Sequence, residues 1–456
     1  MTIAQPRPQT EQRAAELEEL DRRVVLHPHQ TGARDERVIM VRGSGCTVWD
    51  ASGNELLDAM GGSNWIAQVG HGRPELAQAA ADQLSELEYF TGFDIFSNER
   101  AIRLAQRLVG LSPAGLDRVF FTSGGSESIE TAMKLARLYH FHRGQPQRTW
   151  FIARHFGYHG TTYGSGTLTG FTNMHEGIGL LLPHVEKVSQ PNPYRSVDMF
   201  GEGDPTDHLI AELSDTIERI GANNIAAMVG EPVMGGAGVL VPPADYWPRV
   251  RELLSRHGIL LIGDEVVTAF GRTGSWFDSA ARGMAADIVV TAKGLTSGYA
   301  PLGAVLLGNE IAETVAGPKT IFGHGHTYAG HPMCCAVALA NLDVMEADDL
   351  LAKSRAIGDW FDEDLASLRE LPRVGEVRIA GATVGIEVVV DRSTREPLMA
   401  GAVSTEMRKN HKIIVREYGN NVVLAPPLVM TRQEVSRVAD SLHDVISRLT
   451  VDGQLH

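Results

Sequence analysis

The sequence is poor in cysteine. Only three cysteines occur, Cys46, Cys334 and Cys335, and none of them forms a CxxC pair. This pattern excludes a disulfide framework and a zinc site built on thiolates. It also favours a reducing, cytoplasmic setting for the protein.

Long apolar runs are missing, and so is any excess of positive charge. No stretch reaches the length of a transmembrane helix, and the N-terminus lacks the apolar core of a signal peptide. The formal net charge is -15 at pH 7, and no basic cluster offsets it. Because such a charge repels phosphate backbones and anionic lipid surfaces, we expect neither nucleic acid nor membranes as partners.

Several common catalytic motifs are absent as well. The chain has no HExxH, GxSxG, Walker or GxGxxG motif. Its clustered histidines match no common zinc spacing, so we expect no metal; these are His155, His159, His324, His326 and His331. Asp264 and Glu265 are adjacent and point in different directions, which makes them a poor glycosidase pair.

Beyond residue 117, short apolar runs alternate with glycine-rich turns and helical patterns. The runs cover residues 118–121, 225–229, 259–262, 288–290 and 304–307. This alternation predicts an α/β fold with a mostly parallel central sheet covered by helices. Residues 38–60 predict a β-hairpin around a turn at 50–54. We predict an N-terminal segment (1–70) that packs with the small domain, a large domain (71–333) and a smaller C-terminal α/β domain (334–456).

Lys293 is one of only seven lysines and has unusual surroundings. It follows the apolar run 287–292 and precedes the glycine-rich segment 294–303. A lysine at the carboxyl end of a buried strand loses hydration, which lowers its pKa and frees the neutral amine for Schiff-base chemistry. A lysine that extends from the strand end into solvent is an equally weighted alternative.

Asp264 ends another apolar run, 258–263. Ligands of open α/β sheets gather at the carboxyl ends of strands, where an acid can pair with a protonated heterocyclic nitrogen. A helix N-cap or a metal ligand is the alternative interpretation.

A third candidate is the segment 122–127, Thr-Ser-Gly-Gly-Ser-Glu, between a predicted strand and a predicted helix. Its small residues allow backbone N–H groups and the Ser126 hydroxyl to bind phosphate at a helix N-terminus. A capping box is the alternative, and it is compatible with phosphate binding. Tyr158, in the loop after the predicted strand 149–153, can stack on a flat ring or can simply pack.

Together these segments resemble the class III aminotransferases, which are fold-type I enzymes that depend on pyridoxal phosphate. The resemblance extends from about Leu26 to about Leu449. It rests on a set of segments in the expected order: Ser-Gly-Gly-Ser-Glu at 123–127, Tyr-His-Gly at 158–160, Glu-Pro at 231–232, Asp-Glu-Val at 264–266, Thr-Ala-Lys-Gly at 291–294 and His-Thr-Tyr at 326–328. No single segment is specific, but the set is.

The resemblance implies a role for each matching residue on the cofactor side. Lys293 holds pyridoxal phosphate as a Schiff base and shuttles the substrate proton. Asp264 keeps the pyridine nitrogen protonated, and Tyr158 and Val266 enclose the ring. Glu231 is similar to the family's structural glutamate near the cofactor.

The resemblance also implies a shared site. Gly125 and Ser126 bind the phosphate, with Thr327 reaching across from a second subunit. Phe93 matches an aromatic residue that lines the pocket from the partner subunit. The minimal active unit is therefore expected to be a homodimer with shared active sites, and a tetramer is the alternative.

Within the family, the likeness is greatest to the amine:pyruvate (ω-) transaminases. Arg416 matches the arginine that binds the carboxylate of a keto acid and moves away for an amine. A planar guanidinium suits this task because it binds a carboxylate through two hydrogen bonds; an arginine on the surface of an edge strand is the alternative. Gly236 stands where ornithine and γ-aminobutyrate transaminases carry a glutamate, which disfavours an ω-amino-acid specialist. Trp65 ends a pocket segment, 61–65, that is one residue longer than usual.

We therefore expect a transaminase that moves an amino group from an amine or amino acid to a keto acid such as pyruvate, by a ping-pong mechanism. Another class III reaction is the first alternative: an aminomutase, racemase, phospho-lyase or decarboxylating transaminase. A non-catalytic pyridoxal-phosphate sensor is a remote alternative, because it would need a helix-turn-helix domain and a basic face, and neither is visible.

Overall fold

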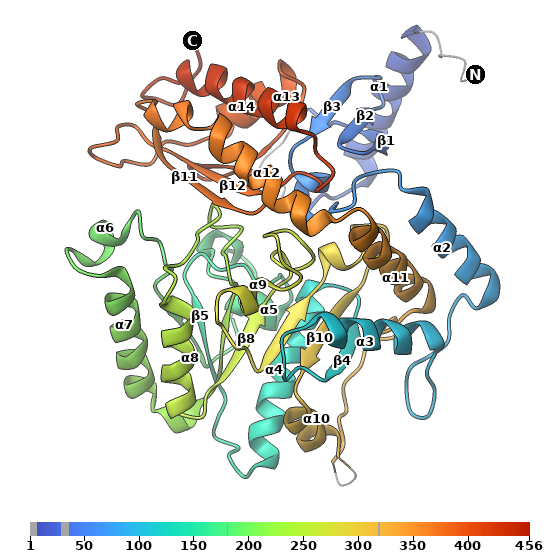
Figure 1. Cartoon of the computed structure of the whole chain (residues 1–456), viewed down its shortest axis with the longest axis vertical. Coiled ribbons are helices and arrows are strands. Elements are labelled where there is room, and N and C mark those ends of the chain that lie inside the picture. The colour runs from blue at the N-terminus through green and yellow to red at the C-terminus, as the bar shows by residue number, and fades with distance from the viewer. Residues whose placement is uncertain (1–6, 29–35, 180, 318–319) are drawn as a thin grey trace.

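The computed structural model describes residues 7–28, 36–179, 181–317 and 320–456. A layer built on one large sheet forms the lower part of Figure 1, and two smaller sheets with their helices lie above it. Among the described helices, none is both long and apolar enough to cross a membrane.

The large sheet has seven strands in the order β4-β10-β9-β8-β7-β5-β6. Their bounds are β4 (Arg118–Thr122), β5 (Trp150–Arg154), β6 (Val185–Val188), β7 (Ile225–Gly230), β8 (Leu260–Asp264), β9 (Ile288–Thr291) and β10 (Gly303–Leu307). Strand β10 runs antiparallel to β4 and β9, and the other neighbouring pairs are parallel. Strands β7 to β10 are buried along their whole length. The predicted mostly parallel sheet is confirmed.

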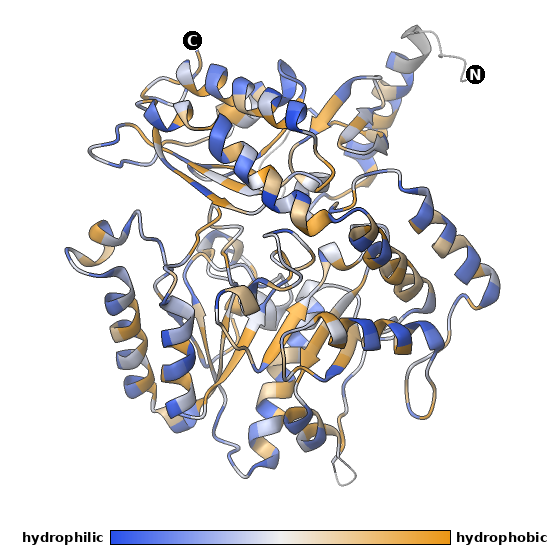
Figure 2. Cartoon of the chain, in the orientation of Figure 1, coloured by the Kyte–Doolittle hydropathy of each residue, from blue (hydrophilic) through white to orange (hydrophobic). Residues whose placement is uncertain are grey.

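Helices cover both faces of this sheet because successive side chains of a strand point to opposite faces. On one face, Ala153 and Val229 pack in a cluster with residues of α4 (Gly125–His142). On the other, Ile152 and Met228 pack with α7 (Pro205–Ile220) and α8 (Tyr246–Arg256). Figure 2 shows the apolar residues concentrated in the strands, with hydrophilic residues on the outer sides of the helices. The shorter helices of this layer are α5 (Tyr163–Leu168), α6 (Ser196–Phe200), α9 (Asp278–Ala281) and α10 (Asn309–Ala316).

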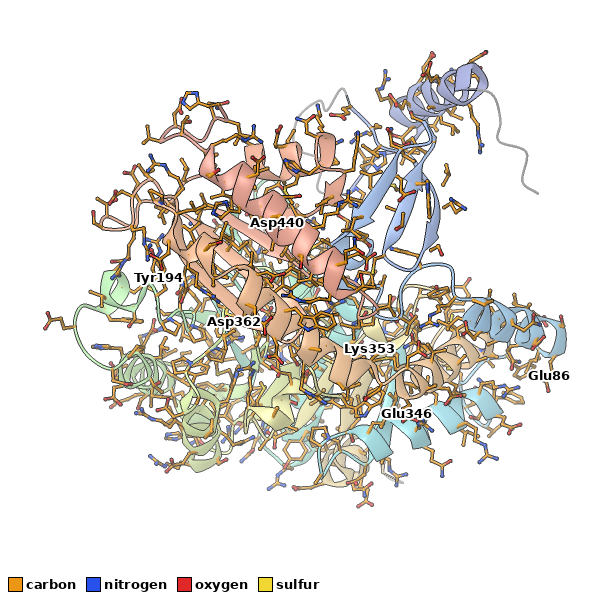
Figure 3. All side chains as sticks on the ribbon, turned by 45° about the horizontal axis from the view of Figure 1, so that its top comes forward. Glu86, Tyr194, Glu346, Lys353, Asp362 and Asp440 are labelled. Carbon is orange, nitrogen blue, oxygen red and sulfur yellow. The ribbon has the colours of Figure 1, made fainter. Side chains whose placement is uncertain are left out.

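A group of three helices packs beside the sheet, namely α2 (Pro74–Glu86), α3 (Glu99–Leu111) and α11 (Pro332–Ala347). Helix α12 (Leu350–Asp364) follows, and it packs against α14 (Arg432–Ser447). The charged residues Glu346, Lys353, Asp362 and Asp440 lie on the outer surface of these helices (Figure 3). This arrangement agrees with amphipathic helices that bury one side.

Two four-stranded sheets complete the fold. The first has the order β11-β12-β15-β14, with β11 (Val374–Ala380), β12 (Thr383–Val388), β14 (Arg416–Tyr418) and β15 (Asn421–Leu424). The second has the order β1-β2-β3-β13, with β1 (Met40–Ser44), β2 (Thr47–Asp50), β3 (Glu55–Asp58) and β13 (Ile413–Ile414). Because β13 pairs in parallel with β3, the N-terminal strands and the C-terminal part of the chain share a sheet. The remaining α-helices are α1 (Arg7–Val24) and α13 (Gly401–Lys409).

The predicted hairpin at residues 38–60 needs one correction. Strands β2 and β3 form it around the expected turn, in which the Asp50 N–H donates to the Asn54 carbonyl. The preceding residues, however, form a separate strand, β1, that pairs back onto β2. Gly45, with a φ of +57°, makes the turn between the two strands. The domain boundaries at residues 70 and 333 stay a prediction.

Candidate active site

Several segments that carry the predicted site residues leave the carboxyl ends of strands in the large sheet. Asp264 ends β8, Glu231 follows β7 directly, and Lys293 follows β9 by two residues. These three strands are adjacent and parallel, so the three side chains meet at one edge of the sheet. Tyr158 follows β5, and the segment 123–126 follows β4 at the same edge.

Lys293 begins a short 3₁₀ turn, η4 (Lys293–Leu295), with a φ of +39°. Its Nζ atom lies 5.4 Å from the centroid of the Trp65 ring. Burial lowers the pKa of Lys293 to about 8, against the negative charges of Asp264 and Glu231. The positive charge of Arg416 lowers this pKa further. At neutral pH, Lys293 is therefore a neutral, nucleophilic amine far more often than a lysine in water is.

Asp264 is buried, and each of its two carboxylate oxygens has a polar contact within the protein. Its Oδ2 atom lies 2.7 Å from Nδ1 of His159, which is also buried, and its Oδ1 atom accepts a hydrogen bond from the Val266 N–H at 3.1 Å. A carboxylate accepts from an N–H, so the Nδ1 atom of His159 carries the proton. His159 holds Asp264 in one orientation, a role that the sequence reasoning missed although the Tyr-His-Gly motif contains this residue.

Glu231 anchors the loop that carries Tyr158. The Tyr158 N–H donates to Oε1 of Glu231 at 3.1 Å, and Nη2 of Arg154 donates to the Glu231 carbonyl at 2.6 Å. Burial raises the pKa of Glu231, and electrostatic interactions with His159 and Arg154 oppose this shift. The structural role that the family resemblance implies for Glu231 stays a prediction.

The N-terminus of α4 points to the same edge of the sheet. The first N–H groups of a helix have no partner within the helix and can bind an anion. The γ-carbons of Val266 lie 3.1 Å from the position that a Cβ atom on Gly125 would occupy, so a larger residue there would press against Val266. The Ser126 hydroxyl accepts a hydrogen bond from the Thr161 N–H at 3.2 Å, which ties the helix start to the loop after Tyr158.

On the opposite side of the site lies the segment η1 (Gly61–Trp65). It forms a wide, π-type turn in which Gly62, Ser63 and Trp65 have φ values of +69°, +59° and +57°. Trp65 is buried and stacks on Tyr418, with ring centroids 5.3 Å apart and an interplanar angle of 21°. Trp65 therefore lies beside Lys293.

Arg416 begins β14 beside this turn. Its Nη1 atom donates to the Ser63 carbonyl at 2.8 Å, and its guanidinium carbon lies 5.2 Å from the centroid of the Tyr418 ring. No carboxylate of a described residue lies within 4.0 Å of this guanidinium. Tyr418, another residue that the sequence reasoning missed, is two positions along the strand and so shares a face with Arg416.

Two glycines form part of the wall between these groups. A Cβ atom on Gly235 would lie 3.8 Å from the Trp65 ring, and one on Gly236 would lie 3.6 Å from the Phe171 ring and 3.7 Å from Cβ of Tyr158. Gly236 therefore lies beside two aromatic side chains, and Gly235 lies beside a third. No local pattern marked Phe171 as part of the site.

Phe93 and Thr327 lie on an exposed surface. Phe93 is 46% exposed, and its ring would lie 2.9 Å from a Cβ atom on Gly325. Thr327 is exposed as well, and its carbonyl accepts a hydrogen bond from the Tyr89 hydroxyl at 2.9 Å. Further large apolar side chains on these two loops are exposed: Phe90, Ile95, Phe96, Ile321 and Tyr328. Two residues expected to serve a partner's site thus share one apolar surface.

The residues at the sheet edge fit pyridoxal phosphate. A buried carboxylate, Asp264, can pair with a protonated ring nitrogen, and Lys293 supplies an amine of lowered pKa. The α4 N-terminus with Ser126 supplies donors for a phosphate. Within the described ranges, no group of three or more His, Cys, Asp or Glu side chains could hold a metal ion.

Comparison with known proteins gives consistent matches. The family model of the aminotransferases of class III matches residues 30–446. The chain is 36% identical over 419 residues to the putrescine–pyruvate aminotransferase of Pseudomonas aeruginosa, with 90% of each chain covered. It matches a thermostable (S)-enantioselective ω-transaminase from Thermomicrobium roseum with a TM-score of 0.90 and 42% identity, over 94% of this chain and 97% of that one. It also matches an amine transaminase from an uncultivated Pseudomonas species, solved in its PLP-bound form, with a TM-score of 0.88 and 40% identity, over 92% and 97%.

Proposed function

The chain belongs to the class III aminotransferases and is a transaminase, and we propose that it carries an amino group from a primary amine to pyruvate. The observation that carries this proposal is the guanidinium of Arg416, which has no carboxylate partner among the described residues and acts electrostatically on the partly buried Lys293. An arginine without a carboxylate partner can bind the carboxylate of a keto acid. The names of the relatives, a putrescine–pyruvate aminotransferase and an ω-transaminase, point to the same substrate classes.

The cofactor implied by the family is pyridoxal phosphate, which supplies an electron sink for the substrate's carbanion when bound. The chain contributes binding, orientation and proton transfer. Asp264, fixed by His159, holds a negative charge where the ring nitrogen must stay protonated. Glu231 and the loop of Tyr158 set the position of the ring's aromatic neighbour.

Lys293 is the proposed acid and base. With pyridoxal phosphate bound, its Nζ atom would take the proton from the substrate carbon that carries the amino group and deliver it to the C4′ carbon of the cofactor, which is general acid–base catalysis by a positioned amine. The lowered pKa of Lys293 favours this exchange, because its neutral form is accessible near neutral pH. Trp65 and Phe171 offer apolar contact for an amine that has no carboxylate.

The test is the conversion of 1-phenylethylamine and pyruvate by the purified, cofactor-loaded enzyme. We expect a yellow absorbance band that bleaches with the amine and returns with pyruvate, and alanine as the product. Lys293→Ala should form no alanine. A band that ignores the amine but responds to an amino acid, without alanine formation, would indicate another class III reaction.

We also propose a homodimer with shared active sites. The exposed apolar surface around Phe93 and Thr327 supports this arrangement, because large contiguous apolar patches on a protein usually mark an interface. Thr327 would complete the partner's phosphate site, and Phe93 would line the partner's pocket. A single chain would then hold an incomplete site.

Two inactive variants test the shared site by complementation. Thr327→Glu places a negative charge where the phosphate binds, and Lys293→Ala removes the amine. If Thr327 serves the partner, a mixed dimer has one site with both residues intact, so mixing the variants after partial dissociation restores part of the activity. If each chain completes its own site, the mixture stays inactive.

A further inference from the structure

Two aromatic rings join the two cations of the site. Lys293 Nζ lies 5.4 Å from the Trp65 ring, Trp65 stacks on Tyr418 at 5.3 Å, and the Arg416 guanidinium lies 5.2 Å from the Tyr418 ring. Tyr418 takes part in two of these contacts, the one with Trp65 and the one with Arg416. Any change in the Tyr418 ring therefore affects both the wall formed by Trp65 and the cation of Arg416.

Besides the Tyr418 ring, the Ser63 carbonyl also supports Arg416, and hydrogen bonds within the turn fix the direction of this carbonyl. Asp58 is buried and accepts hydrogen bonds from the Met60 and Gly62 N–H groups at 2.9 and 2.6 Å. His71 contacts the same carboxylate at 2.8 Å. Because the start of the turn is held in this way, the Ser63 carbonyl is fixed toward Nη1 of Arg416.

These two supports leave most of the guanidinium available. An arginine has five N–H donors, and Ser63 takes one of them on Nη1. The edge formed by Nε and Nη2 donates to no described residue. That edge can bind a carboxylate through two hydrogen bonds while Tyr418 and Ser63 hold the rest of the group in place. Holding a side chain in its binding orientation reduces the entropy lost when a ligand binds.

We propose that Tyr418 is a positioning residue that, together with the Ser63 carbonyl, holds Arg416 ready for the carboxylate of the keto acid. This inference rests on the proposed function. The ring face supplies the contact, so the hydroxyl is dispensable. Tyr418 thereby favours substrates with a carboxylate over equally apolar ones without it. A leucine at this position would keep an apolar side chain but lose the ring face that attracts the cation.

The test compares two unreactive ligands of the cofactor-loaded enzyme by calorimetry. 3-Phenylpropionate carries a phenyl group for the aromatic wall and a carboxylate for Arg416, and 3-phenylpropan-1-ol lacks the charge. The measured quantity is the ratio of the two dissociation constants. We expect Tyr418→Leu to reduce the preference for the carboxylate about 5-fold, and Tyr418→Phe to retain it. The pyruvate KM should rise with Tyr418→Leu while the kcat changes less.

Arg416→Leu completes a double-mutant cycle. If Tyr418 acts through Arg416, adding Tyr418→Leu to Arg416→Leu leaves the ratio unchanged. The proposal is overturned if Tyr418→Leu weakens both ligands equally, if it increases the preference for the carboxylate, or if its effect persists without Arg416. Should Tyr418→Leu fail to fold, Tyr418→Met gives the same comparison with a more adaptable side chain. Wild-type alanine formation is measured first, since its absence contradicts the proposed function and not this inference alone.

Discussion

The two sides of the site are built in different ways. On the cofactor side, Asp264, Glu231 and Lys293 leave the ends of adjacent parallel strands that are buried along their whole length. On the substrate side, Trp65 lies in a turn with four positive φ values, and Arg416 and Tyr418 come from a short strand of another sheet. One side is anchored in the core of the large sheet, and the other is assembled from segments distant in sequence.

This difference separates two kinds of task. The cofactor side must hold charges and a proton donor at fixed positions, and a buried sheet edge does this because packing and hydrogen bonds leave few alternatives. The substrate side must accept both an amine and a keto acid, so it needs a cation that can engage a carboxylate and a wall that suits apolar groups. Changes on the cofactor side should therefore reduce kcat, and changes on the substrate side should alter KM.

The largest effect is expected for Lys293→Ala. The variant loses both the amine that attaches to the cofactor and the group that moves the substrate proton, so we expect kcat to fall by about 10³-fold or more. Alanine formation from 1-phenylethylamine and pyruvate measures the loss. Lys353→Ala, which removes an exposed lysine on α12, is the matched control and should behave like wild type.

Asp264→Asn should have the next largest effect. The substitution preserves the shape of the side chain but removes the negative charge opposite the ring nitrogen, so we expect kcat to fall by about 10²- to 10³-fold. Stopped-flow measurement of each half-reaction with the cofactor bound checks this. His159→Gln should reduce kcat less, because Asp264 keeps its charge and its contact with the Val266 N–H. An Asp264→Asn enzyme with wild-type kcat would show that the carboxylate serves only as a turn residue.

The sequence was informative for the cofactor side for a physical reason. A buried parallel strand appears as a short apolar run, and the residue after the run must lie at the sheet edge, where ligands of this fold gather. The positions of Asp264 and Lys293 follow from this rule without any long-range information, whereas Glu231 was assigned from the family resemblance. Val266 and Gly125 were assigned from resemblance, and their close approach of 3.1 Å depends on packing that no local pattern reveals.

The substrate side was predictable only in part. Arg416 and Trp65 came from the family resemblance, but the stacking of Trp65 on Tyr418 joins residues that are 353 positions apart. Such contacts depend on how the N-terminal turn lies against a C-terminal strand, and sequence periodicity carries no information about this. The extra strand β1 was missed for a simpler reason, since a single glycine turn at Gly45 divides what reads as one alternating segment.

Arg416→Leu should act mainly on the Michaelis constant of the keto acid. Hydrogen bonds to a charged group contribute about 1.5–3 kcal/mol, so we expect the pyruvate KM to rise by about 10- to 100-fold. The amine substrate has no carboxylate, so its own Michaelis constant should change by less than about threefold. Steady-state kinetics with pyruvate and the phenylethylamine both varied measures the two constants. Equal increases in both would contradict the division of tasks between the two sides.

The smallest predicted effect links the two sides through charge. Burial lowers the pKa of Lys293 to about 8 in the absence of cofactor, and Arg416 contributes to this shift. Below that pH, the neutral fraction of the amine, and hence its rate of reductive methylation by formaldehyde, should rise about tenfold per pH unit and then level off. Mass spectrometry of the apoenzyme gives this rate for Lys293, with the exposed Lys353 as an internal reference.

Removing the positive charge in Arg416→Leu raises the pKa of Lys293, because a like charge nearby disfavours the protonated amine and its loss favours it. The methylation rate at pH 7 should therefore fall, whereas the rate well above the pKa should stay the same. If the two enzymes follow the same curve, Arg416 does not influence Lys293 electrostatically. The substrate side would then influence the reaction only by binding the substrate, and not by changing the pKa of Lys293.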